Sequence, residues 1–400
     1  MGGVSDLEHY LQSFEADPGY LNWASYGPLA PAVRAEALAD VELLATGRPT
    51  GIELVAGRVR EARSTLATFL DCRDDEVVLQ PSTSQGLTHA FFGLSGDVLL
   101  SPYEFPALTI GARRAHDALG RLRVVDLEDT QDGVTVDAVR GALTDDVTAV
   151  AVSLVDYRTG YLADLAGIRD VIGDRLLIVD AIQALGVVDV DWSLADVVCG
   201  NGYKWLRAGR GSGYARFSDR ARDVIEPVLS GTGGMDGVLG DLEVPPPLGT
   251  AQAYVISPSD PVSAARLDVG LREVAAAGVP RIAERVAERA RAVFELADAH
   301  GIPVLTSRER HAGIVTLVPD AAALGALGAA LANNGLTVTT RGGTIRVSVH
   351  AGTTDETLQR LGDAFAEAAV TATHILAPAL PEEPALTDVV VLSADDLDGD

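Results

Sequence analysis

One residue carries much of the chemical information in this sequence: Lys204 is the only lysine among 400 residues, whereas arginine occurs thirty times. Lysine is normally among the commonest residues. Arginine supplies a general positive charge, but only a lysine amine can lose its proton in a pocket and attack a carbonyl to form a Schiff base. A coding bias that spared one surface lysine would give the same count, so the neighbouring motifs must decide.

A carboxylate and an amide follow a buried strand pattern upstream of this lysine. The apolar run 176–179 ends in Asp180, Gln183 comes one helical turn later, and Lys204 lies 24 residues after Asp180. Ligands of open α/β sheets gather at the carboxyl ends of strands. A carboxylate there could keep a pyridinium nitrogen protonated, which makes the ring of pyridoxal phosphate an electron sink. Asp180 alone would be interpreted as a helix N-cap; paired with the sole lysine, it favours a cofactor site.

Residues after two further predicted strands could bind the phosphate group and the flat ring of such a cofactor. The segment 81–86 reads Pro-Ser-Thr-Ser-Gln-Gly and precedes an apolar helical pattern, so Thr83 and Ser84 lie where free backbone amides and hydroxyls bind anions. After the next strand, Phe105 could stack on a flat cofactor. An ordinary Ser/Thr cap and a core phenylalanine are the alternative interpretations.

Composition excludes several classes of function. The net charge of −26 argues against a nucleic acid or an anionic membrane surface as partner, because both would repel the chain. Cys72 and Cys199 cannot form a disulfide framework, and neither has metal-site spacing with the seven histidines, so we expect no metal. No apolar run reaches membrane-span length, and we expect no export signal and a cytoplasmic location.

The hydrophobic pattern predicts two domains. Seven short apolar strands alternate with helices, which indicates an α/β domain over 30–250 with a mostly parallel sheet covered on both faces. We expect an N-terminal segment (1–29), a Pro/Gly-rich junction (241–262), a small α+β domain (251–375) and a poorly ordered acidic tail (376–400) that includes the patch 389–392. The large-domain strands are predicted at 76–80, 97–101, 122–126, 147–154, 176–181, 197–200 and 212–217. The small-domain strands are predicted at 302–305, 313–318, 336–340 and 344–349, after helices in 264–299 broken near Gly278.

Taken together, the motifs resemble those of the class V aminotransferase family, in the same order and with similar spacing from about Leu21 to Ala369. The motifs that carry the resemblance are Ser82-Thr83-Ser84, Glu104-Phe105-Pro106, Asp156-Tyr157-Arg158-Thr159-Gly160, Asp180, Gln183 and Tyr203-Lys204-Trp205-Leu206. This group of fold type I enzymes contains cysteine desulfurases, kynureninases and isopenicillin N epimerase-like proteins. The resemblance implies a homodimer that binds pyridoxal 5'-phosphate at sites on the subunit interface and acts on a small α-amino acid.

The resemblance also assigns roles, motif by motif. It makes Lys204 the Schiff-base lysine and proton shuttle, and Asp180 the partner of the pyridine nitrogen. It implies that Gln183 donates to the ring oxygen and that Phe105 stacks on the ring. The residues it implies for the phosphate are Thr83, Ser84, Tyr203 and, from the neighbouring subunit, Thr250. The residues it implies for the substrate are Arg346, whose fork suits a carboxylate, and Asn22 of the N-terminal segment.

The departures from the family pattern limit what the resemblance says about the reaction. Desulfurases carry a nucleophilic cysteine in a loop before the carboxylate-binding arginine, and residues 333–344 contain none. Kynureninases have an aromatic-rich stretch after Leu-Ser-Gly, whereas residues 229–234 of this chain read Leu-Ser-Gly-Thr-Gly-Gly. Arg210 stands where the family commonly has proline. The residues hardly separate transamination from elimination at the β-carbon, and the family name favours an aminotransferase. The alternatives are a β-lyase or a kynureninase-like hydrolase.

The sequence also leaves two alternatives from other classes of protein. A non-catalytic scaffold would keep the fold, but the intact lysine, aspartate and arginine argue against it. A nicotinamide enzyme is suggested by the glycine cluster 209–213, yet that cluster leads into a strand, whereas the dinucleotide fingerprint opens a helix.

Overall fold

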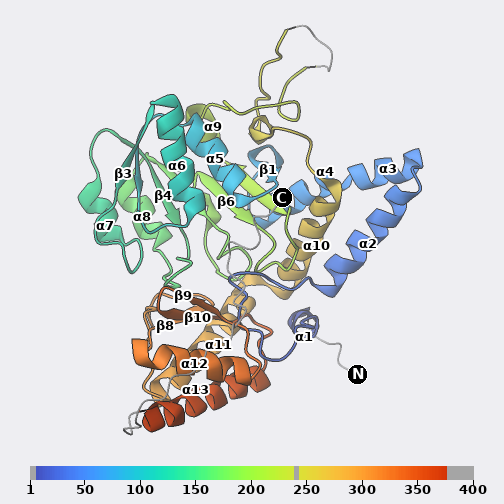
Figure 1. Ribbon diagram of the computed structural model, residues 1–400. Helices are drawn as coiled ribbons and strands as arrows, with labels where there is room; N and C mark the ends of the chain where they lie inside the picture. Colours follow the sequence, from blue (N-terminus) through green and yellow to red (C-terminus); the bar gives the residue numbers. More distant parts are fainter. Residues whose placement is uncertain (1–5, 238–242, 376–400) are drawn as a thin grey trace, which may run out of the picture.

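A seven-stranded sheet forms the centre of the computed structural model, which describes residues 6–237 and 243–375 (Figure 1). The strand order is β1-β7-β6-β5-β4-β2-β3, and β7 alone runs antiparallel to both of its neighbours. The strands are β1 Val77–Gln80, β2 Gly96–Leu100, β3 Leu122–Asp126, β4 Val147–Ser153, β5 Leu176–Asp180, β6 Val197–Asn201 and β7 Gly213–Phe217. The predicted mostly parallel seven-stranded sheet is confirmed, with every strand within one residue of its predicted bounds.

Helices cover both faces of this sheet, which explains why its central strands β4 and β5 are mostly apolar, whereas the edge strand β3 keeps the exposed Arg123 and Asp126. In β4, Val150 and Val152 join one buried cluster and Ala149 and Ala151 the other, because successive side chains point to opposite faces. One face carries α5 Thr83–Gly93 and α6 Pro106–Leu119; the other carries α4 Arg58–Phe69, α8 Leu165–Ile172 and α10 Pro261–Ala277. The remaining helices around the sheet are α2 Pro31–Ala45, α3 Pro49–Ala56, α7 Val136–Ala142, α9 Asp219–Val224 and the short 3-10 helices η1 Asp74–Glu76, η2 Trp192–Leu194 and η3 Ala251–Tyr254.

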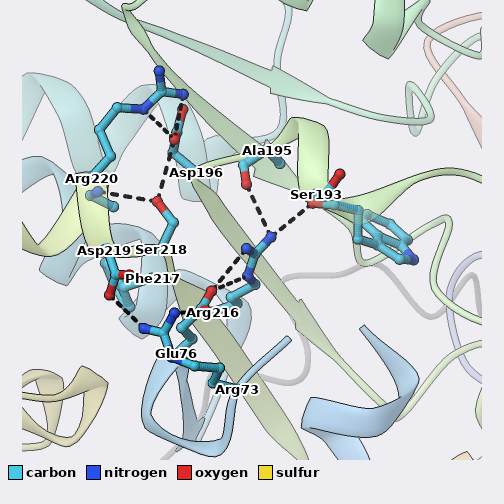
Figure 2. Close-up of polar contacts among 12 residues, drawn as sticks. Arg73, Glu76, Ser193, Ala195, Asp196, Arg216, Phe217, Ser218, Asp219 and Arg220 are labelled. Atoms are coloured by element: carbon cyan, nitrogen blue, oxygen red, sulfur yellow. Dashed lines mark hydrogen bonds and ion pairs between the residues drawn. The ribbon is translucent and has the colours of Figure 1, made fainter. Parts of the chain in front are cut away.

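Buried ion pairs fix the end of the sheet that faces away from the carboxyl termini of its parallel strands (Figure 2). Arg216 of β7 pairs with Glu76 just before β1 and donates to the carbonyls of Trp192 and Ala195. Asp196, just before β6, accepts from Arg169 and Arg220. Removing one partner of a buried pair is strongly destabilising. Loss of one partner should therefore disrupt this end of the sheet, whereas ligands of open α/β sheets bind at the opposite, carboxyl end.

A small domain with its own sheet follows α10. Its sheet has the antiparallel order β8-β10-β9, with β8 Ile314–Leu317, β9 Thr339–Arg341 and β10 Thr344–Ser348. The helices α11 Val279–Ala299, α12 Ala321–Asn333 and α13 Asp355–Ile375 enclose a core of their own with this sheet (Figure 1). The predicted break near Gly278 is confirmed, since that residue has φ +87° and Pro280 lies in the first turn of α11. The exact domain boundaries stay a prediction.

Two small-domain strands differ from the sequence prediction. The predicted strand at 302–305 is wrong: only Val304 forms a bridge, with Leu317, because Pro303 has no N–H to extend a ladder. The predicted strand at 336–340 begins only at Thr339. Residue Thr337 pairs instead with the N-terminal segment, where its amide donates to Gly19 at 2.9 Å and its carbonyl accepts from Leu21 at 3.0 Å.

The N-terminal segment contributes side chains to the cores of both the large and the small domain. After α1 Asp6–Gln12, Leu21 is buried in the small-domain core and Trp23 in the core of the large sheet. The predicted acidic tail and its patch 389–392 lie outside the described residues, as does part of the predicted junction. Among the residues described, no helix is both long enough and apolar enough to cross a membrane.

Candidate active site

Lys204 and Asp180 meet at the carboxyl end of the large sheet. Asp180 is the last residue of β5, and Lys204 follows β6 by three residues; both side chains are buried. Burial lowers the pKa of Lys204 to about 7, helped by the positive charge of Arg346 and opposed by Asp180. Burial also raises the pKa of Asp180 to about 6, against the Ile182 amide and Lys204. A lysine with a pKa near 7 has a free amine at physiological pH, which is what nucleophilic attack on a carbonyl requires.

Two aromatic rings lie near the lysine amine. The Lys204 Nζ lies 5.9 Å from the centroid of Phe105 and 5.6 Å from that of Tyr203. Phe105 directly precedes α6, contacts Tyr157 edge-on at 5.1 Å, and is 37% exposed. A phenylalanine that serves only the core would be buried. The open ring beside the amine fits the predicted stacking on a flat cofactor.

The predicted phosphate loop provides an unpaired donor. The side chain of Ser82 caps α5 by accepting from the amide of Gln85 at 3.2 Å, so this serine has the ordinary capping role. The hydroxyl of Thr83 is buried and has no hydrogen-bond partner among the described residues. Buried polar groups are almost always paired, and α5 adds the positive end of its dipole. An anion at this position would satisfy Thr83. Ser84 is exposed at the same turn.

Gln183 is held from two sides. Its Oε1 accepts from the indole Nε1 of Trp205 at 2.8 Å, and its Nε2 donates to the carbonyl of Ala24 at 3.0 Å. An amide nitrogen carries two hydrogens. The second one is available for the predicted contact with the ring oxygen of the cofactor.

Thr250 lies apart from this group within one chain. It caps η3, and the next residue but one, Gln252, donates to the carbonyl of Val77 at the first residue of β1, whereas Thr83 follows the other end of β1. Four strand residues span roughly 10 Å or more. The role of Thr250 at the phosphate of a neighbouring subunit and the homodimer both stay predictions.

Arg346 comes from β10 of the small domain and reaches the carboxyl end of the large sheet. Its Nη1 donates to the carbonyl of Tyr157 at 2.7 Å and its Nη2 to the hydroxyl of Ser25 at 2.6 Å. Burial lowers the pKa of Arg346 to about 10. The predicted substrate residue Asn22 lies nearby, but its Oδ1 is occupied by the hydroxyl of Thr339 at 2.7 Å.

Sequence reasoning did not assign roles to two buried residues at the site. Glu104 accepts from the amide and hydroxyl of Ser153, and burial raises its pKa to about 7. Asn201 donates to the carbonyl of Pro81 at 3.2 Å and accepts from the amide of Tyr203 at 3.2 Å, which ties the phosphate loop to the lysine loop. Glu104 directly precedes Phe105 in one of the motifs, and Asn201 is the last residue of β6. These two positions in the sequence were the signals by which both residues could have been found.

Neither cysteine is placed or ionised for chemistry. Cys199 is buried inside β6, and burial raises its pKa well above the usual value. Cys72 follows α4 and is partly buried, and burial raises its pKa to about 11. A reactive cysteine requires the thiolate, which both environments disfavour.

Residues 53–361 match the family model described as "Aminotransferase class-V". The chain belongs to the class-V aminotransferase family. It is 24% identical over 283 residues to a probable cysteine desulfurase of Pyrococcus abyssi, covering 66% of this chain and 68% of that protein. It is 27% identical over 264 residues to the cysteine desulfurase IscS of Ectopseudomonas mendocina, covering 61% of this chain and 64% of that protein. The predicted family is confirmed.

Solved structures share the fold. A cysteine desulfurase from Thermococcus onnurineus NA1 has a TM-score of 0.76 at 19% identity, covering 89% of this chain and 94% of that one. The cystine C-S lyase C-DES, solved in complex with its reaction product cysteine persulfide, has a TM-score of 0.79 at 18% identity, covering 88% and 98%. The predicted fold type I architecture is confirmed.

The class-V family depends on pyridoxal 5'-phosphate, so the predicted cofactor and the enzymatic nature of the protein are confirmed. The residues of this chain fit that group. The orphaned hydroxyl of Thr83, the open ring of Phe105 and the deprotonatable amine of Lys204 supply a phosphate donor, a stacking surface and a nucleophile. The aminotransferase expectation is not confirmed, because these curated relatives are named as desulfurases.

Proposed function

We propose that this protein is a pyridoxal-phosphate-dependent lyase that breaks the Cβ–S bond of a sulfur-containing α-amino acid without forming a persulfide on the protein. The observation that carries this proposal is the absence of a usable thiol at a site otherwise equipped like those of the family. Residues 333–344 contain no cysteine, and both thiols elsewhere in the chain have raised pKa values. The names of the relatives point to C–S bond chemistry, and the C-DES structure is that of a cystine C-S lyase.

The residues that would hold the cofactor are Thr83 at the phosphate, Phe105 at the ring face, Asp180 at the ring nitrogen and Gln183 at the ring oxygen. Bound pyridoxal phosphate supplies an electron sink for the charge that develops on the substrate Cα. Asp180, as a carboxylate, would keep the ring nitrogen protonated. Gln183 can donate only the hydrogen that Ala24 does not take.

Lys204 would act in the proton transfers. With a pKa of about 7, its amine can take the Cα proton and then deliver a proton to the leaving sulfur. The Cβ–S bond breaks with its electron pair on sulfur, and the enamine left behind hydrolyses to a 2-oxo acid and ammonia. Arg346 would pair with the α-carboxylate, and its burial strengthens that contact. No step in this sequence needs a protein thiol.

The products separate the candidate reactions. A lyase converts cysteine to pyruvate, ammonia and sulfide, and cystine to pyruvate, ammonia and cysteine persulfide. A desulfurase converts cysteine to alanine and leaves the sulfur on the protein. An aminotransferase releases a 2-oxo acid without free ammonia and passes the amino group to a second 2-oxo acid. A kynureninase-like hydrolase releases anthranilate from kynurenine.

The test is to incubate the holoenzyme with cysteine, cystine or kynurenine, and with alanine plus 2-oxoglutarate, and to measure pyruvate, alanine, ammonia, sulfide, glutamate and anthranilate separately. We expect pyruvate and ammonia in equal amounts from cystine or cysteine. The double variant Cys72→Ala/Cys199→Ala should retain turnover per folded molecule, and Lys204→Arg should have none. Alanine as the main product of cysteine, or loss of turnover in the folded double variant, would contradict the lyase. Glutamate without ammonia would establish transamination instead.

A further inference from the structure

A chain of side-chain hydrogen bonds leads from Arg346 into the N-terminal segment. The Nη2 of Arg346 donates to the hydroxyl of Ser25 at 2.6 Å, and the two hydroxyl oxygens of Ser25 and Thr339 lie 3.1 Å apart. The hydroxyl of Thr339 donates to Oδ1 of Asn22 at 2.7 Å. These residues come from three elements: Arg346 from β10, Thr339 from β9, and Ser25 and Asn22 from the stretch before α2.

The direction of this chain is fixed by counting hydrogens. A hydroxyl has one hydrogen to donate, and a side-chain amide oxygen can only accept. Thr339 gives its hydrogen to Asn22, so in the contact between the two hydroxyls Ser25 must donate to Thr339. Ser25 then has its lone pairs free to accept from the guanidinium of Arg346, which can only donate. Every hydrogen therefore points away from Arg346 and toward Asn22.

The backbone around Ser25 is held on both sides. Toward the small domain, the amide of Ala24 donates to the hydroxyl of Ser348 at 3.0 Å, and the amide of Ser348 donates to the carbonyl of Leu21 at 2.7 Å. Toward the catalytic lysine, the amide of Gly27 donates to the carbonyl of Tyr203 at 2.8 Å. A Cβ on Gly27 would lie 1.9 Å from the carbonyl oxygen of Lys204, so the segment packs directly against the lysine loop.

Arginine has a long, flexible side chain, and ordering it costs conformational entropy. The carbonyl of Tyr157 holds Nη1 at 2.7 Å, and Ser25 holds Nη2, so the plane of the guanidinium is fixed before a substrate arrives. Pre-organised donors bind a carboxylate without paying that ordering cost again.

We propose that Ser25 is a positioning residue that fixes the guanidinium of Arg346 for the α-carboxylate of the substrate, with Thr339 and Asn22 orienting the Ser25 hydroxyl. The inference rests on the proposed function insofar as that function gives Arg346 the carboxylate. It also gives Asn22 an indirect role in place of the direct substrate contact that the family resemblance implied.

The experiment uses glycine, which has an α-carboxylate but no Cβ–S bond to break, and glycinamide, which lacks the carboxylate. Their dissociation constants are measured from the visible absorbance change of the holoenzyme. A hydrogen bond to a charged group is worth about 1.5 kcal/mol, so Ser25→Ala should weaken glycine binding roughly tenfold and leave glycinamide binding unchanged. Ser25→Thr, which keeps the hydroxyl, should recover most of the affinity. In turnover of cystine, KM should rise while kcat changes less than about twofold.

The control variant is Thr344→Val. It removes a hydroxyl from the same strand as Arg346, and that hydroxyl donates to the carbonyl of Arg341 and lies outside the chain of hydrogen bonds that leads to Asn22. It should bind both ligands as the unaltered enzyme does. In an Arg346→Ala background, adding Ser25→Ala should have no further effect on glycine.

The outcomes distinguish the carboxylate role of Arg346 from the positioning role of Ser25. If Arg346→Ala itself leaves glycine affinity unchanged, the carboxylate role within the proposed function is wrong. If Arg346→Ala weakens glycine but Ser25→Ala does not, or if Ser25→Ala weakens glycinamide equally, the positioning role of Ser25 is overturned while the proposed function stands.

Discussion

The indole Nε1 of Trp205 donates a 2.8 Å hydrogen bond to Oε1 of Gln183, and this contact fixes which way the buried amide faces. An indole nitrogen only donates and a backbone carbonyl only accepts. With Trp205 on one side and the carbonyl of Ala24 on the other, the oxygen of Gln183 must face Trp205 and its nitrogen must face Ala24. Trp205, the residue directly after Lys204, thereby determines which hydrogen of Gln183 remains for the proposed contact with the cofactor.

Trp205→Phe should destabilise the protein by about 1 to 3 kcal/mol, because it leaves the buried Oε1 of Gln183 without a donor. The measurement is the free energy of unfolding of the apo-protein in urea. Trp23→Phe is the matched control, since the indole N–H of Trp23 is buried without a partner among residues 6–237 and 243–375, and its loss removes no hydrogen bond seen there. Equal losses in the two variants would assign the effect to volume alone.

Two parts of the site could be predicted from the sequence: Asp180, because it ends a predicted strand, and Lys204, because lysine is otherwise missing from the chain. Asp180 follows a strand buried on both faces, and such strands show as unbroken apolar runs, so its place at the carboxyl edge of the sheet was predictable. Lys204 was marked by being the only lysine. These signals are local, because they depend on a few consecutive residues.

The contacts that orient these groups were not predictable in the same way. Ser25 and Arg346 are 321 residues apart, and Gln183 and Ala24 are 159 apart. Such pairs arise from how the N-terminal segment lies between the two sheets, and no periodicity in the sequence encodes that. The erroneous strand at 302–305 had a different cause, since its apolar pattern was outweighed by the missing N–H of Pro303.

Borohydride treatment of the holoenzyme should attach the cofactor to Lys204 alone among the side chains, because no other side-chain primary amine exists in the chain. The label is located by peptide mass spectrometry. Lys204→Arg should keep a positive charge, but no label should be found on that residue. The variant should also lack the visible absorbance of a cofactor bound to lysine, since arginine does not present a free amine. A label found only on the N-terminal amine would contradict the assignment of Lys204.

Thr83→Val should weaken pyridoxal phosphate more than pyridoxal. The variant keeps the shape of the side chain but removes the buried hydroxyl, which has no hydrogen-bond partner in the described part of the chain. Loss of one hydrogen bond to a charged phosphate corresponds to about 1.5 to 3 kcal/mol, or roughly ten- to a hundredfold in the dissociation constant. The affinities are measured by titrating the apo-protein and following absorbance. Thr88→Val is the control, because the hydroxyl of Thr88 bonds within α5 to the carbonyl of Ser84. Equal weakening for both ligands would remove Thr83 from the phosphate site.

The stability of the apo-protein should depend on pH through the buried amine of Lys204. Its pKa in the folded chain is about 7, against an ordinary value of 10.5, because burial disfavours the ammonium form. Between those two pH values the unfolded chain binds more protons than the folded one at this residue, so the contribution of Lys204 to stability rises with pH. Below pH 7 both states carry the proton, and the full cost of burying the ammonium remains.

Comparison with Lys204→Met isolates this contribution, since methionine has a similar length and does not titrate. The difference in unfolding free energy between the unaltered apo-protein and the variant should increase in favour of the former from pH 7 to 10, by an amount on the order of a few kcal/mol, and should level off about one pH unit below the pKa of Lys204. Urea unfolding at closely spaced pH values measures it. Lys204→Arg, charged at every pH in that range, should lack the rise as the methionine variant does. Parallel curves for all three proteins would mean that the amine of Lys204 titrates near its ordinary pKa and is not prepared for attack on a carbonyl at neutral pH.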